Sequence, residues 1–221
     1  MNHTHRYATL VFVFALLTCG SLRAMENDGF QSIVNPSNLK GWIVEGTSTF
    51  EKDGTQHPIW TISNGEVRCE GHGFGFLRYE KHLKDFSVSL EVKTAPNVNT
   101  GVGLRGIPYV TNQLKTRPSM AGFEVQILDD AGQTPTSSSS GSLYRYVPAL
   151  KSAIKKAGEW NRLEIICKGP RIRVTLNGET VQDFEQSSNA ATSHKPLDGY
   201  LSLQNHGGDA TFRNIRLMQL D

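Results

Sequence analysis

The sequence lacks the features of helical, metal-binding or strongly charged proteins. Of its 221 residues only three are cysteines, and beyond residue 24 it contains no His-x-His or Cys-x-x-Cys pair of the kind that marks common metal sites. It also lacks an amphipathic helix of normal length, because the segment 149–157 is long enough for only a turn or two. These absences favour a protein built from strands.

Long hydrophobic runs are also missing. One apolar run, at about residues 8–17, follows a short basic start and precedes Ala24, and it is too short to span a bilayer. This pattern predicts a signal peptide over residues 1–24, one domain over 25–221, and export to the periplasm or the extracellular space. Leu16-Leu17-Thr18-Cys19 loosely resembles a lipobox, so attachment to a membrane is expected only if Cys19 is lipidated.

An excess of one charge is absent as well. The chain has 23 basic and 21 acidic residues, and loss of the predicted signal peptide removes Arg6 and Arg23 and leaves 21 of each. Such a balance gives no reason to expect a nucleic-acid partner.

Two of the three cysteines, Cys69 and Cys167, would remain in the chain after loss of the signal peptide. An exported protein permits them to pair, but both lie in strand-like runs, and a core of this size favours two buried free thiols.

What the sequence does contain is period-two alternation separated by turn signals. Asn64-Gly65 separates two short apolar runs and predicts a type I′ hairpin. Further strands are expected at 85–93, 101–105, 163–168, 172–176, 199–204 and 210–217. We interpret the series as a meander of antiparallel hairpins in two packed sheets, interrupted by irregular stretches at 46–57, 107–120 and 133–141.

The stretch 122–130 carries the strongest functional signal. Its alternation directs Phe123, Val125 and Ile127 into the core and places Glu124 and Gln126 on the other face, with Asp129 after the strand end. A carboxylate and an amide on one strand face indicate a site, although a solvated strand edge is the alternative. The spacing is similar to the Glu-x-Asp-x-x-Glu strand of laminarinase-type glycosidases.

The same parity argument adds residues from other strands. If Val102 and Leu104 face the core, Arg105 faces the ligand side, and Gln204 does so on the strand 199–204, with His206 just beyond it. Each also has a plain interpretation, as a surface charge, strand decoration or a loop histidine. Tyr144 follows a serine tract in a flanking loop. A mixed set of Glu124, Asp129 and His206 is a candidate site for a divalent metal ion.

An ordered series of short motifs carries a family resemblance. The chain resembles the 3-keto-disaccharide hydrolase domain family over nearly all of the predicted mature chain. The motifs include Gly41-Trp42, the hairpin at 60–67, Asp85-Phe86, the stretch 122–129, Gly141-Ser142-Leu143-Tyr144, Gly158-Glu159-Trp160-Asn161, Leu176-Asn177-Gly178, Leu203-Gln204-Asn205-His206-Gly207 and Phe212-Arg213-Asn214-Ile215. The resemblance implies an all-β, concanavalin A-like jelly-roll sandwich of two antiparallel sheets.

The chemistry expected from this resemblance is cleavage of the glycosidic bond of a 3-keto-glycoside or a disaccharide. In a 3-keto-glycoside, the C2 hydrogen lies next to the C3 carbonyl group, so a base can remove it. The resulting enolate expels the C1 substituent, and water then adds to the sugar. Glu124 or His206 is the candidate base, Arg105 or a metal ion the oxyanion partner, and Asp129 or Tyr144 the acid, with Gln126 and Gln204 binding substrate. An ordinary glycoside hydrolase and a non-catalytic, lectin-like carbohydrate-binding module remain the alternatives.

Overall fold

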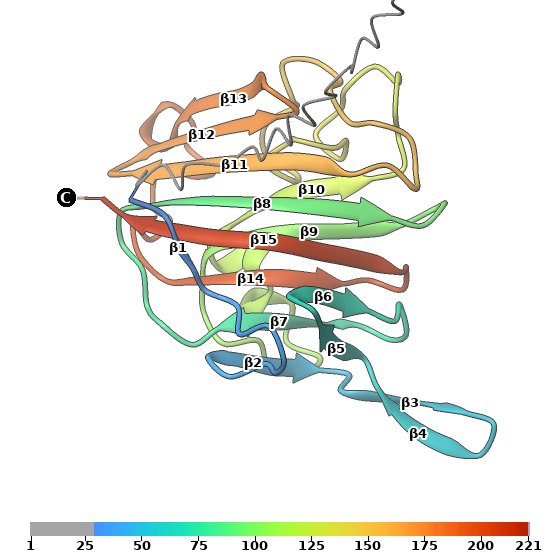
Figure 1. Cartoon of the computed structure of the whole chain (residues 1–221). Helices are drawn as coiled ribbons and strands as arrows, with labels where there is room; N and C mark the ends of the chain where they lie inside the picture. The colour runs from blue at the N-terminus through green and yellow to red at the C-terminus, as the bar shows by residue number, and fades with distance from the viewer. Residues whose placement is uncertain (1–28, 221) are drawn as a thin grey trace, which may run out of the picture.

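The computed structural model describes residues 29–220, and within them the chain forms two packed antiparallel sheets and one separate hairpin. The two sheets lie one behind the other in Figure 1. The larger sheet has the order β13 (Glu179–Glu185), β12 (Arg171–Leu176), β11 (Asn161–Lys168), β8 (Phe86–Thr94), β15 (Ala210–Gln219), β6 (Glu66–Cys69) and β5 (Trp60–Ser63), with β1 (Gln31–Ser32) also paired to β15.

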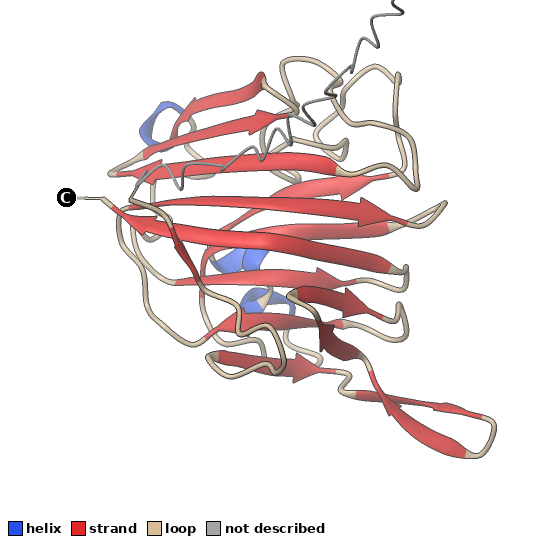
Figure 2. Cartoon of the chain, in the orientation of Figure 1, coloured by secondary structure: helices blue, strands red, loops and turns tan. Residues whose placement is uncertain are grey.

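The smaller sheet carries three of the candidate site residues, Glu124, Gln126 and Gln204. Its order is β10 (Phe123–Leu128), β9 (Asn99–Gly106), β14 (Tyr200–Asn205), β7 (Gly75–Tyr79) and β2 (Trp42–Gly46). Helical structure in the described part of the chain is limited to α1 (Pro118–Ala121) and the single 3-10 turns η1 (Leu114–Thr116) and η2 (Gln186–Ser188), as Figure 2 shows. The expected all-β jelly-roll sandwich is therefore confirmed.

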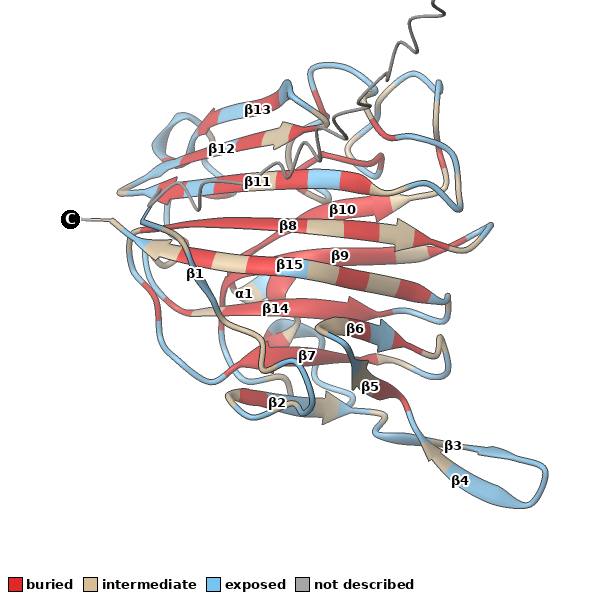
Figure 3. Ribbon diagram, viewed as in Figure 1, coloured by how far each residue is buried: buried red, intermediate tan, exposed pale blue. Residues whose placement is uncertain are grey.

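The core lies between the two sheets and consists of apolar side chains from the inward faces of both. Figure 3 shows the buried residues along these strands. Phe123, Val125 and Ile127 of β10 are almost fully buried there, as are Leu201 and Leu203 of β14. Burial of each such side chain contributes about 1.5–3 kcal/mol relative to exposure. Because alternate residues of these strands are fixed in the core, the residues between them must lie on the outer face of the smaller sheet.

The connections differ from the expected meander. β8 and β9 are consecutive but belong to different sheets, and β15 inserts between β8 and β6. Sandwiches require such crossings because each sheet must be covered by the other. Within the described residues, no helix is long and apolar enough to cross a membrane.

The turns show where sequence patterns succeeded and where one was missed. Asn64 and Gly65 have φ angles of 52° and 77°, which confirms the predicted hairpin between β5 and β6. The stretch 46–57, expected to be irregular, instead contains the hairpin of β3 (Thr49–Lys52) and β4 (Thr55–Pro58). Its turn residues Asp53 and Gly54 also have positive φ, and Asp-Gly is a hairpin signal in its own right.

The two cysteines in the described chain are free and buried, as expected. Cys69 ends β6 and Cys167 lies in β11, and β15 and β8 separate these two strands. Three strand spacings amount to about 14 Å, well beyond the Cα separation that a disulfide can span. The predicted signal peptide, with Cys19, lies outside the described residues.

Candidate functional site

The candidate site lies on the outer face of the smaller sheet, where the strand register places polar side chains in two rows. Glu124 on β10 pairs with Gly103 on β9, Gly103 pairs with Ser202 on β14, and Ser202 pairs with Arg78 on β7. One step along, Gln126 pairs with Gly101, and Gln204 pairs with Phe76. We call Glu124, Gln126, Ser202 and Gln204 the outer polar cluster.

Two glycines on β9 allow the members of this cluster to meet. A Cβ at Gly101 would lie 2.9 Å from Glu124 Oε1, and one at Gly103 would overlap the Ser202 hydroxyl. With no side chain on β9 in between, Glu124 reaches across that strand, and Gln204 Nε2 donates a hydrogen bond to Glu124 Oε1 at 2.8 Å. Glycine here provides space for a side chain rather than an unusual backbone angle.

Glu124 is an unusual carboxylate because it is only 3% exposed and faces no ion-pair partner at hydrogen-bonding distance. Desolvation raises its pKa to about 7, and the Ser119 hydroxyl, the Gln204 amide and the charge of Arg117 only partly oppose this rise. A half-turn of the Gln126 amide lets its nitrogen donate to Glu124 Oε1 at 3.3 Å and to Thr100 O at 3.2 Å. A group with this pKa exchanges protons readily near neutral pH.

Several buried polar atoms of the cluster have no hydrogen-bond partner. They are Glu124 Oε2, Gln204 Oε1 and Ser202 Oγ, and Arg117 Nε is a fourth such atom near by. Buried polar groups in folded proteins are nearly always paired, so a group of unpaired ones needs an explanation. Hydroxyl groups of a bound ligand would satisfy both the acceptors and the donors.

Residues 107–122, which we call the cover segment, lie over this face. A Cβ on Gly103 would lie 2.6 Å from Pro118 Cβ, so the glycine also makes room for the proline ring. Pro118 opens α1, where the fixed φ of proline suits the first helical position. The segment thereby brings Arg117 and Ser119 to Glu124.

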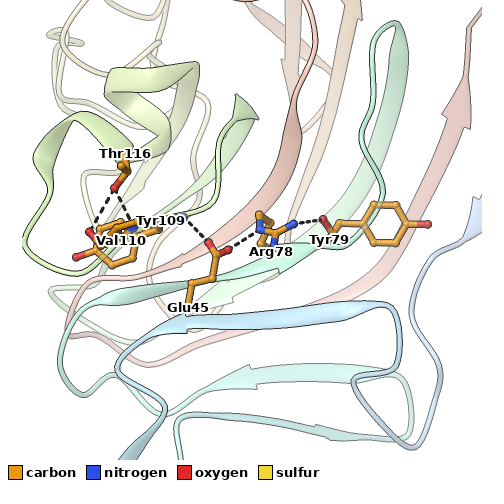
Figure 4. Close-up of polar contacts among 6 residues, drawn as sticks. All are labelled: Glu45, Arg78, Tyr79, Tyr109, Val110 and Thr116. Atoms are coloured by element: carbon orange, nitrogen blue, oxygen red, sulfur yellow. Dashed lines mark hydrogen bonds and ion pairs between the residues drawn. The ribbon is translucent and has the colours of Figure 1, made fainter.

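An ion pair on the same sheet face holds the beginning of the cover segment (Figure 4). Arg78 Nε lies 2.5 Å from Glu45 Oε1, and the other carboxylate oxygen accepts from the backbone N–H of Tyr109 at 2.9 Å. Both charged side chains are about nine-tenths buried, and the Arg78 guanidinium also stacks on Tyr200 at 4.3 Å. A buried pair with this geometry fixes the position of what it holds.

The other end of the segment is held by Lys195. Its Nζ donates to the carbonyl oxygens of Met120 at 2.6 Å and Gly122 at 2.7 Å, where α1 ends. Burial, together with the smaller effect of the Arg145 charge, lowers the pKa of this amine to about 8. The cover segment is thus anchored on both sides of Arg117.

Two of the predicted substrate-binding residues, Gln126 and Gln204, lie in the cluster beside Glu124. Tyr144 joins them, because Leu143 bridges Val125 in antiparallel fashion and the Tyr144 N–H donates to Glu124 O at 2.8 Å. This register places Tyr144 next to Glu124 at the outer edge of β10. The parity argument was correct for these strands.

Arg105 lies elsewhere, contrary to expectation. Its side chain is fully buried, and it donates to Lys84 O at 3.2 Å and lies 3.4 Å from Asp85 Oδ1. The cause is local: Arg105 has φ of +53°, and the pairing of β9 with β14 shifts register at this point. A bulge reverses the alternation of faces, so parity counted from Val102 fails by Arg105.

Asp129 is also separate from Glu124. It accepts a hydrogen bond from the backbone N–H of Asn97 at 3.1 Å at the end of β10. Five residues of extended chain span about 16 Å, more than the separation in retaining or inverting glycosidases. The suggested metal set of Glu124, Asp129 and His206 is therefore not assembled, and residues 29–220 contain no cluster of three metal-binding side chains.

His206 lies beyond β14, at the margin of the cluster. Its ring meets Phe74 edge to face at 5.1 Å, and the Arg117 guanidinium lies over the same phenyl ring at 4.2 Å. Partial burial, followed by the charge of Arg117, lowers the pKa of His206, so the imidazole is neutral at neutral pH.

Sequence reasoning missed Arg117, Arg78 and Glu45. Only Arg78 had a signal, the alternation of Phe76 and Arg78 with the core residues Leu77 and Tyr79.

Comparisons with known proteins bear on the family and the fold of this chain. A curated 3-keto-disaccharide hydrolase of Bacteroides thetaiotaomicron is 24% identical over 244 residues, which cover 89% of this chain and 80% of the relative. Two solved structures of candidate glycosyl hydrolases from Parabacteroides distasonis share the fold. The first has a TM-score of 0.71 and 20% identity, and the match covers 87% of this chain and 95% of that one. The second has a TM-score of 0.63 and 24% identity, and the match covers 81% of this chain and 99% of that one.

Binding proteins also share the fold. The carbohydrate-binding module CBM66 from Bacillus subtilis matches with a TM-score of 0.56 and 14% identity over 83% of this chain and 98% of the module. The family comparison is more specific than these structural likenesses and supports a carbohydrate-active role. The sequence pattern for 3-keto-alpha-glucoside-1,2-lyase-like domains matches residues 29–218, almost the whole described chain, and the protein belongs to that family.

Proposed function

We propose that the protein cleaves the glycosidic bond of 3-keto-glucosides by removing the C2 proton, with Glu124 as the base. The observation that carries this proposal is the state of Glu124: a buried carboxylate on the outer sheet face, one oxygen unpaired, with its pKa raised to about 7. Catalytic bases work best when their pKa lies near the working pH.

The reaction follows from the acidity of a hydrogen next to a ketone. Glu124 takes the C2 proton, and the electrons form an enolate whose charge rests on the C3 oxygen. The enolate then expels the C1 substituent as the departing alcohol accepts a proton. Water adds to C1 of the resulting unsaturated ketone while a proton returns to C2, which restores the keto sugar. Elimination thus needs only one base of this kind at C2.

The alternatives fit the geometry less well. An ordinary glycosidase needs a second carboxyl group within about 10 Å, and Asp129 is too far away and engaged with Asn97. A non-catalytic module would not require a buried carboxylate with a raised pKa, since that arrangement costs stability. The residues around Glu124 are proposed to bind substrate or carry protons; they are Gln126, Tyr144, Gln204 and His206. Export of the protein is proposed from the sequence alone.

The experiment compares Glu124→Gln with the wild type on a nitrophenyl 3-keto-α-glucoside and on the parent glucoside. We expect the wild type to cleave only the keto form and the variant to lose about 100-fold to 10,000-fold in rate while still binding it. The matched control is Glu164→Gln, which removes one carboxylate from the opposite sheet. Unchanged turnover in the Glu124 variant, or equal binding of both sugars without turnover by the wild type, contradicts the proposal.

A further inference from the structure

In addition to Arg78, which is already paired with Glu45, Arg117 brings a positive charge to the outer polar cluster. Its Nε is buried without a hydrogen-bond partner, and its guanidinium carbon lies 4.2 Å from the centre of the Phe74 ring. Its charge acts on both Glu124 and His206, which lie on two different strands or their extensions. A guanidinium with an unused buried donor, whose charge acts on a carboxylate that also has an unpaired oxygen, is a group prepared to meet a ligand.

The backbone around Arg117 is held from several directions. The ring of Pro118, the next residue, packs where Gly103 leaves space, and Thr116 Oγ1 accepts from the N–H of Val110 at 2.9 Å. Glu45 holds one end of the cover segment, and Lys195 holds the other. These contacts fix the position of Arg117 and leave its Nε free of a hydrogen-bond partner. Electrostatic catalysis is effective when the donor is already in position before the reaction begins.

We propose that Arg117 binds the C3 oxygen of the keto sugar and stabilises the negative charge that develops there when Glu124 removes the C2 proton. The inference rests on the proposed function and gives its oxyanion partner. Arg105, the sequence-based candidate, is buried away from the site beside Asp85. C2 and C3 are bonded neighbours, so a base and a cation that converge on one small region suit the two ends of the same enolate.

The test compares Arg117→Gln and Arg117→Lys with Lys115→Gln, which removes the same charge from an exposed position of the same segment. On the nitrophenyl 3-keto-α-glucoside, we expect Arg117→Gln to lower kcat by about 100-fold to 1,000-fold with a smaller change in KM. Arg117→Lys should recover part of the loss, and Lys115→Gln should behave as the wild type. Thermal unfolding confirms that each variant is folded.

A second readout separates a direct role from a structural one. The charge of Arg117 favours the ionised form of Glu124, so its loss should move the Glu124 titration, followed by carboxyl ¹³C NMR without substrate, to higher pH. Lys115→Gln should leave that titration in place. The inference is overturned if Arg117→Gln keeps kcat within about threefold of Lys115→Gln while Glu124→Gln is inactive, or if kcat falls without the titration shift. Full activity of Glu124→Gln would instead overturn the proposed function itself.

Discussion

At the scale of single residues, the chemistry of the site depends on a carboxylate that the fold keeps in an unfavourable place. Gly101 and Gly103 let Glu124 lie across β9, where desolvation favours the protonated acid. Alternation of faces predicted Glu124, Gln126 and Gln204 correctly because β10 and β14 keep their period through these positions. It failed at Arg105, where a positive φ and a register shift reverse the face, and neither feature has a marker in the sequence.

Glu124 should therefore lower stability at high pH. Its folded pKa, about 7, lies above its unfolded value of 4.5, so the contribution it makes to stability is present below pH 4.5 and lost as the pH rises through 7. The shift corresponds to about 3 kcal/mol. We expect the free energy of unfolding of Glu124→Gln, relative to the wild type, to rise by about this amount from pH 4.5 to pH 8. Urea denaturation at the two pH values measures it, and a constant difference would show that Glu124 is not desolvated.

At the scale of elements, the sequence showed the cover segment only as an irregular stretch, 107–120, before the central strand, and it did not show how that stretch is held. It has no hydrophobic period, and its position depends on Glu45 and Lys195, which are distant in sequence. Contacts of that kind are determined by the assembled fold rather than by local propensity. The strands beside it in sequence, β9 and β10, were predicted close to their observed bounds, whereas β2, which carries Glu45, was not predicted.

Glu45 provides a test of how the segment is held. The carboxylate of Glu45 accepts from Arg78 with one oxygen and from the Tyr109 N–H with the other. In Glu45→Gln, the amide has only one accepting oxygen, so it cannot accept from both in this geometry, and it leaves the buried Arg78 charge unpaired. We expect a loss of about 3 kcal/mol in stability and faster tryptic cleavage after the exposed Lys115. Glu51→Gln, in the exposed strand β3, is the matched control. If both variants are cleaved at the same rate, the Glu45 contact does not hold the segment.

At the scale of the whole molecule, the two sheets form one core that also encloses both thiols of the described chain. Burial raises the pKa of Cys69 and of Cys167 to about 12, so neither is a thiolate at neutral pH. We expect almost no reaction of either thiol with Ellman's reagent in the native protein and reaction of both in urea. Rapid labelling of the folded protein, or a mass lower by two hydrogens, would contradict a packed core with free cysteines.

In the proposed mechanism this sandwich positions one base for elimination, so the fate of the C2 hydrogen distinguishes elimination from direct hydrolysis. Turnover of the 3-keto-α-glucoside in heavy water, with an enzyme-free control for spontaneous exchange, should place deuterium at C2 of the released keto sugar from the earliest time points. Glu124→Gln should abolish both release and incorporation. Release of a keto sugar that retains protium at C2 would rule out elimination and show that the bond is hydrolysed directly.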